Sequence, residues 1–231
     1  MKIYALADTH LSFASPKPMD MFGPDWEGHW EKLSAFWRAK VSSEDAVLIA
    51  GDISWAMTLQ DALADLSAIG ELPGKKILIR GNHDYWWGSI SRVREAAPAG
   101  MFFLQNDALK LGEAVICGSR GWLNPNADGF TAEDRKIYDR ELIRMEMSLA
   151  AGKKLMGENS RLIAMTHYPP VYPDKKPTAM SALFEKYNVS RVIFGHIHSM
   201  RGGWEPFELN GVKYILTAGD YIKFDPMLIY P

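Results

Sequence analysis

The sequence of 231 residues has little of several features that define whole classes of protein. It contains one cysteine, Cys117, so no intrachain disulfide can form. No apolar run approaches the roughly 20 residues of a membrane-spanning helix, and the apolar segment after Met1 is too short for the core of a signal peptide. We therefore expect a cytoplasmic protein with a reduced, buried cysteine and no membrane partner.

An excess of charge of one sign is also missing. The 26 Lys and Arg residues nearly balance the 28 Asp and Glu residues, which gives a formal net charge of −2. Such a chain has no global positive field to attract a nucleic-acid backbone or an anionic membrane. An anionic substrate would need a local positive centre, and a bound metal ion is one way to supply it.

What the sequence does contain is a series of short apolar runs, with helical patterns between the early ones. Apolar runs of this length are typical of strands that are buried on both faces. We predict strands at residues 3–7, 46–50, 76–79, 114–117, 162–165, 192–194, 214–217 and 227–230. Apolar residues at helical spacing predict helices over residues 30–41, 59–69 and 135–151. Strands that alternate with helices indicate an α/β fold, and the lack of a linker favours a single domain over residues 1–231.

Three long irregular segments separate these elements, at residues 12–28, 118–131 and 168–178. Connections of this length in a compact domain are often functional lids. Several aromatic residues follow strand ends and could line a substrate pocket or simply pack the loops: Trp55, Tyr85, Trp86, Trp87 and Trp122.

Potential metal ligands follow five of the predicted strands. The five strand ends carry Asp8-Thr9-His10, Gly51-Asp52, Gly81-Asn82-His83-Asp84, Thr166-His167 and Gly195-His196-Ile197-His198. Of the six histidines, only His29 lies outside these clusters. One histidine at a strand end is most simply a loop residue, but five in such places are hard to explain by coincidence. Because ligands bind at the carboxyl ends of strands in open α/β sheets, we expect these side chains to converge.

The types of donor indicate which metals would bind. Imidazole, carboxylate and amide groups without a thiolate suit Mn, Fe, Zn, Co or Ni better than Mg or Ca. Alternate residues of an extended segment point to the same side, so Asp8 and His10 could reach one site, as could His196 and His198. The candidate ligands are too many for one ion, whereas their number suits two ions that share a bridging carboxylate.

In their order and composition, the five blocks resemble the signature motifs of the calcineurin-like metallophosphoesterase superfamily. The resemblance spans nearly the whole chain, and it is specific because five blocks agree at once. It implies a four-layer αββα sandwich in which two mixed β-sheets are flanked by helices, with a dimetal site at the carboxyl ends of the strands. It also implies a dinuclear metal-dependent phosphoric ester hydrolase, with Mn, Fe or Zn as the metals.

The resemblance further implies a role for each motif residue. Two sets of three ligands and one bridging carboxylate would hold the metals: Asp8, His10 and His198; Asn82, His167 and His196; and Asp52 as the bridge. His83 would be the catalytic histidine that is not a ligand, and Asp84 is a candidate for its acidic partner. A hydroxide that bridges the metals would attack phosphorus, and His83 would assist the leaving group.

The segment after Asp52 narrows the substrate class. Protein Ser/Thr phosphatases of the superfamily continue as Gly-Asp-x-x-Asp-Arg-Gly, whereas residues 51–57 read Gly-Asp-Ile-Ser-Trp-Ala-Met. The chain therefore resembles a small bacterial member of the phosphodiesterase branch. We predict hydrolysis of small phosphoesters, most simply phosphodiesters, with a phosphomonoesterase as the alternative. A non-catalytic binding scaffold and a DNA nuclease are further alternatives, but every expected position is filled and the chain has no basic appendage.

Overall fold

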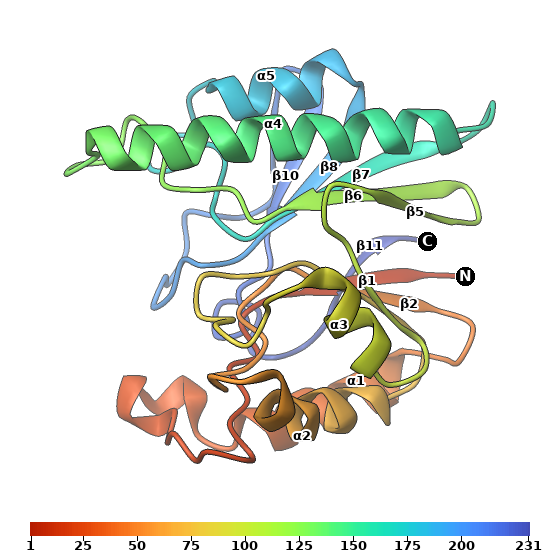
Figure 1. Ribbon diagram of the computed structural model, residues 1–231, viewed down its shortest axis with the longest axis vertical. Coiled ribbons are helices and arrows are strands. Elements are labelled where there is room, and N and C mark those ends of the chain that lie inside the picture. Colours follow the sequence, from red (N-terminus) through yellow and green to blue (C-terminus); the bar gives the residue numbers. More distant parts are fainter. The chain divides into compact units, whose positions relative to one another are not determined.

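The computed structural model describes residues 1–231 and divides the chain into two compact units. The first unit is formed by Met1–Phe103 together with Thr217–Pro231, and the second by Leu104–Leu216. Each unit is built on one mixed β-sheet with helices beside it (Figure 1). The chain thus has the predicted α/β fold with two mixed sheets flanked by helices.

In the first unit the sheet has the strand order β11-β1-β2-β3-β4. Its strands are β1 (Ile3–Leu6), β2 (Ala46–Ile49), β3 (Lys75–Leu78), β4 (Met101–Phe103) and β11 (Met227–Tyr230). The pairs from β1 to β4 are parallel, and β11 lies antiparallel at the edge. Three helices lie on one side of this sheet (Figure 1): α1 (His29–Lys40), α2 (Leu59–Gly70) and α3 (Ile90–Ala96). Two 3-10 turns precede α1: η1 (Asp20–Phe22) and η2 (Pro24–Trp26).

Apolar side chains explain how these elements pack. Leu6 and Ile49 from the sheet join Trp37 of α1 and Leu66 of α2 in one hydrophobic cluster. Leu48, which alternation directs to the opposite face of β2, is also buried. The strands are therefore buried on both faces, as their continuous apolar runs predicted. Each buried side chain of this size contributes about 1.5–3 kcal/mol, which holds the strand ends in a defined place.

In the second unit the sheet has the strand order β5-β6-β7-β8-β10-β9. Its strands are β5 (Ala108–Leu111), β6 (Ala114–Ser119), β7 (Arg161–Thr166), β8 (Val189–Phe194), β9 (Phe207–Leu209) and β10 (Val212–Leu216). The four central strands pair in parallel, and β5 and β9 are antiparallel edge strands. Helices α4 (Ala132–Leu155) and α5 (Ala179–Lys186) lie along one side of this sheet (Figure 1).

The position of α4 is set by a cap at one end and a glycine near the other. Thr131 and Asp134 form a capping box, in which each side chain accepts a hydrogen bond from the backbone N–H of the other residue. Gly152 faces β6, where an added Cβ would overlap the Cys117 Sγ and approach the Leu162 Cδ1 to 3.0 Å. A side chain at this position would push the helix away from the sheet.

All the predicted strands and helices are present, with ends shifted by a few residues. The structure adds β4, β5, β9, α3 and α5, which the apolar pattern did not predict. Edge strands β5 and β9 are partly exposed and lack a continuous apolar run, while α3 and α5 have only 7 and 8 residues. None of the helices combines the length and the apolarity needed to cross a membrane.

Candidate metal centre

The candidate ligands of the first unit follow three neighbouring parallel strands. Asp8 and His10 come after β1, Asp52 after β2, and Asn82 and His83 after β3. Since β1 pairs with β2 and β2 with β3, the three segments leave the sheet at the same edge. This is the edge at which open α/β sheets bind ligands.

Four of the candidate ligands have a left-handed backbone conformation. The φ angle is 59° at Asp8, 45° at His10, 52° at Asp52 and 72° at His196. Each such residue costs of order 1–3 kcal/mol and persists only where the surrounding structure holds it. Strain of this kind gathers at functional sites, so its location here points to a binding role for these residues.

Asp52 lies at the centre of the contacts in the first unit. The His10 Nε2 lies 3.7 Å from the Asp52 Oδ2, and the backbone N–H of His83 donates to the Asp52 Oδ1 at 2.8 Å. The backbone of His10 also donates to the carbonyl oxygen of Asp52 at 3.0 Å. Gly81 leaves the space that Asp52 needs, because a Cβ on Gly81 would overlap both the Oδ1 and the backbone nitrogen of Asp52. The three segments are therefore locked together around one carboxylate.

Asp84 is buried and accepts five hydrogen bonds. The donors to Oδ1 are the backbone N–H of Ile53 (2.8 Å) and Ser54 (3.2 Å) and the Trp86 Nε1 (3.0 Å), and the donors to Oδ2 are the backbone N–H of Gly81 (2.7 Å) and Asp52 (3.0 Å). Desolvation by burial, and then repulsion from Asp52, raise the pKa of Asp84 to about 7, while the amide hydrogen bonds lower it. His83 is not among the donors. The Asp84 carboxylate thus connects the segment after β2 to the segment after β3.

Aromatic rings surround the histidines of the first unit. The Trp55 ring stacks on His10, with centroids 4.7 Å apart and planes at 22°, and its centroid lies 4.4 Å from that of His83. Of the other aromatic residues singled out in the sequence, Trp86 and Trp87 belong to the hydrophobic cluster. These two pack the loop after β3, whereas Trp55 packs directly against candidate site residues.

In the second unit His167 and His196 lie side by side. His167 follows β7, and His196 and His198 follow the neighbouring parallel strand β8. The His196 Nδ1 is 3.2 Å from the His167 Nε2. Tyr168 packs against both imidazoles, with its ring centroid 4.2 Å from that of His196 and 5.5 Å from that of His167.

The donor atoms of each unit fit a transition metal. The His196 Nδ1 and His167 Nε2, 3.2 Å apart, are close enough for both to hold one ion, and so are the His10 Nε2 and the Asp52 Oδ2, 3.7 Å apart. Imidazole with carboxylate is the donor set that Zn, Mn or Fe would prefer.

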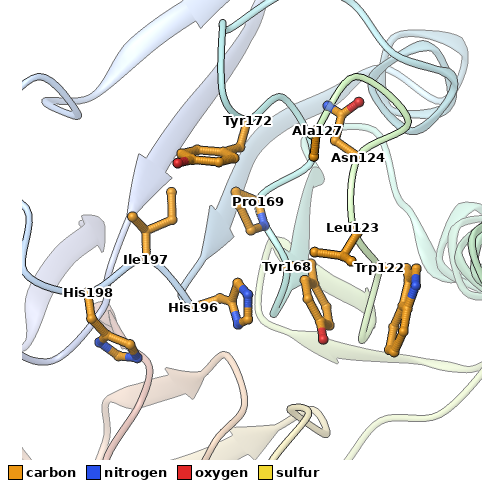
Figure 2. Close-up of a pocket in the computed structure, with 10 residues that line it drawn as sticks. All are labelled: Trp122, Leu123, Asn124, Ala127, Tyr168, Pro169, Tyr172, His196, Ile197 and His198. Atoms are coloured by element: carbon orange, nitrogen blue, oxygen red, sulfur yellow. The ribbon is translucent and has the colours of Figure 1, made fainter. Parts of the chain in front are cut away.

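A cavity of about 230 Å³ in the second unit contains residues that the sequence did not single out. His196 and His198 contribute to its lining, and Figure 2 shows Tyr168, Tyr172 and Asn124 among the other side chains that surround it. These three residues belong to the irregular segments 118–131 and 168–178, and only the length of these segments indicated in the sequence that they could be functional. Trp122, named as a pocket or packing residue, also lines the cavity.

Comparison with known proteins identifies the family. Residues 1–200 match the family described as calcineurin-like phosphoesterase. The chain therefore belongs to this family, and the resemblance predicted from the five sequence blocks is confirmed.

Two curated phage proteins match only part of this chain. The chain is 40% identical over 86 residues to the Gene 66 protein of Mycobacterium phage D29, and 35% identical over 78 residues to that of Mycobacterium phage L5. These matches cover 36% and 34% of this chain but only 40% and 37% of the phage proteins, so the chain matches about two fifths of their length.

Solved structures of the same fold have still lower identity. A protein of unknown function from Aquifex aeolicus has a TM-score of 0.54 at 15% identity, covering 98% of this chain and 94% of that one. A Thermus thermophilus protein has a TM-score of 0.57 at 11% identity, covering 95% and 89%. At these identities the likeness shows the fold alone.

Proposed function

We propose that the protein hydrolyses small phosphoesters, most simply phosphodiesters, with two transition-metal ions as cofactors. The observation that carries the proposal is that every motif residue of the family is present and follows a strand of the sheets, with four of them in strained left-handed conformations. The ligands we assign are Asp8, His10, Asp52, Asn82, His167, His196 and His198. Mn, Fe and Zn are the metals that this donor set favours.

When bound, the metals supply the positive charge that neutralises phosphate oxygens and acidifies water for attack. The residues of the chain hold and orient the reacting groups. His83 is fixed through its backbone on the Asp52 carboxylate, and its ring packs against Trp55. We assign His83 the transfer of a proton to the leaving oxygen, a role worth about 10²–10⁴-fold in rate. Asp84 is a positioning residue in this proposal, because its five donors are amides and an indole.

The diester preference rests on the segment after Asp52. Residues 53–57 lack the arginine with which related protein phosphatases hold a phosphate monoester. A phosphomonoesterase is the alternative. Comparing the hydrolysis of bis-p-nitrophenyl phosphate with that of p-nitrophenyl phosphate distinguishes the two, since faster turnover of the monoester would refute the diester assignment.

The central test compares two histidine variants. We expect His83→Ala to lower kcat by about 10²–10⁴-fold while the metal content, measured by elemental analysis, stays unchanged. His196→Ala should lose both metal and activity, because its imidazole is an assigned ligand. Loss of metal in His83→Ala would make that residue a ligand and overturn the assignment. Full activity after exhaustive chelation would refute metal dependence altogether.

A further inference from the structure

The cavity of the second unit has a continuous aromatic wall that begins at the histidines. The ring of His196 packs on Tyr168, and Tyr168 packs on Trp122 with centroids 5.0 Å apart and planes at 49°. Figure 2 shows these three rings in sequence, with His198 also on the cavity lining. A group bound beside the imidazoles would therefore meet the faces of aromatic rings.

This wall is held rigidly before any ligand arrives. The Trp122 Nε1 donates to the Asp134 Oδ1 at 3.0 Å, and the Arg120 guanidinium lies 4.6 Å from the Trp122 ring centroid. At another part of the lining, Tyr172 stacks on Trp204 with centroids 5.8 Å apart and planes at 27°. Aromatic surfaces that are already ordered lose little conformational entropy when they bind a ring.

Asn124 adds a hydrogen-bond donor to the same lining. Its side chain is only 4% exposed, and its Oδ1 accepts a hydrogen bond from the backbone N–H of Asn126 at 3.0 Å. That bond fixes the orientation of the amide, and the Nδ2 is left buried without a partner. Asn124 lines the cavity, so an acceptor that reaches its amide from the cavity would satisfy the buried Nδ2.

The volume of the cavity limits what it can hold. At about 230 Å³ it is smaller than the roughly 300–1,000 Å³ typical of a site for a whole ligand. It suits one ring system of a larger substrate whose phosphate lies at the histidines. Resting on the proposed function, we infer that the cavity binds the organic group of the phosphoester. We further infer that this group is a planar aromatic ring with a hydrogen-bond acceptor, the chemistry of a nucleobase, stacked on Trp122 or Tyr172 and bonded to Asn124.

Three phosphonates test this inference in the metal-loaded protein, because each resembles the phosphomonoester that diester hydrolysis releases and cannot itself be hydrolysed. Methylphosphonate lacks a ring, phenylphosphonate carries a ring without an acceptor, and adenosine 5′-methylenephosphonate carries a nucleobase. Isothermal titration calorimetry measures the Kd of each. We expect at least one aromatic probe to bind about tenfold more tightly than methylphosphonate, which is within the contribution of stacking on an aromatic side chain. The two aromatic probes also separate a nearby aryl group from a more distant nucleobase.

Substitutions of the lining residues show where in the cavity the aromatic group binds. Trp122→Leu and Tyr172→Leu each remove one ring, and at least one should reduce the aromatic preference to about twofold. Asn124→Asp keeps the acceptor for Asn126 and removes the donor, so it should weaken the nucleoside probe several-fold relative to phenylphosphonate. Phe36→Leu, on the exposed face of α1, is the control and should leave all three Kd values unchanged.

Each result decides the inference. Metal-dependent binding of all three probes with equal Kd overturns the aromatic subsite and leaves the proposed function standing. An aromatic preference that survives both ring variants also overturns it, because the ring is then bound elsewhere. An unchanged ratio of the two aromatic probes in Asn124→Asp overturns the role of the donor. Absence of metal-dependent binding of all three probes overturns the inference, whereas the hydrolysis of bis-p-nitrophenyl phosphate decides the proposed function separately.

Discussion

Asp84→Asn is the substitution whose effect the structure defines most closely. The change keeps the size of the side chain but leaves one oxygen acceptor where there were two. In the better orientation, the amide oxygen takes the place of Oδ1 and keeps its three donors. The amide nitrogen then faces the backbone N–H groups of Gly81 and Asp52, which lose their acceptor.

The expected magnitude follows from those two lost bonds. A buried donor without a partner costs about 1–3 kcal/mol, so two would cost about 2–6 kcal/mol. Burial and the repulsion from Asp52 raise the pKa of Asp84, and removing the charge relieves both effects. We therefore expect the lower part of the range, a loss of about 2–3 kcal/mol, which for a chain of this size lowers Tm by about 4–12 °C.

Urea denaturation with and without a chelator measures this loss, because bound metal adds its own stabilisation of the native state. The variant should also bind metal more weakly, since the backbone of Asp52 loses its anchor. Asp128→Asn is the matched control: Asp128 is exposed, and its change should shift the stability by less than about 0.5 kcal/mol. Equal stability and equal metal affinity in Asp84→Asn and the wild type would refute the positioning role of Asp84.

Three further substitutions test the packing around the strands. Lys76 is buried in β3 and donates to the carbonyl groups of Gly70, the last residue of α2, and of Leu72 just after it, so Lys76→Met should lower the free energy of unfolding by about 2–5 kcal/mol in urea denaturation. The exposed Lys75 on the same strand is the control, and an equal loss of stability in Lys75→Met would show that the buried hydrogen bonds of Lys76 do not stabilise the fold. Gly152→Ala should lower stability by roughly 1–3 kcal/mol through overpacking, although alanine has the higher helix propensity. A higher Tm would show that α4 tolerates a side chain there. Gly81→Ala should weaken metal binding in calorimetric titrations by displacing Asp52, and wild-type affinity would count against that close contact.

The strands and their ends could be predicted because both signals are local. A buried strand requires a continuous apolar run, and the polar residue after the run marks where burial of apolar side chains ends. Asp8 and Asp52 were found in this way. The edge strands β5 and β9 gave no such signal, because an edge strand that is partly exposed can alternate or interrupt its apolar residues.

The hydrogen-bond partners of Asp84 could not be predicted from its place beside His83. Adjacency in sequence suggested that the two side chains work as a pair. In the structure the carboxylate binds backbone amides that begin at Asp52, 32 positions earlier in the chain. The sequence pointed to Trp122 but not to Asn124 and Tyr168 as lining residues of the cavity, since these two acquire their positions from loop conformations that depend on contacts far away in sequence.

These contacts also explain how Asp52 keeps its left-handed backbone. Three consecutive N–H groups, those of residues 52–54, point at the Asp84 carboxylate and form a concave anion-binding arrangement of the backbone. A typical hydrogen bond contributes about 0.5–1.5 kcal/mol, so three of them offset the roughly 1–3 kcal/mol that a left-handed residue costs. The Asp84 carboxyl thus serves as the internal acceptor that turns the backbone, and the turn presents Asp52 beside His10. Asp84 therefore acts through Asp52, its neighbour in space, and substituting Asp84 should first disturb the position of Asp52.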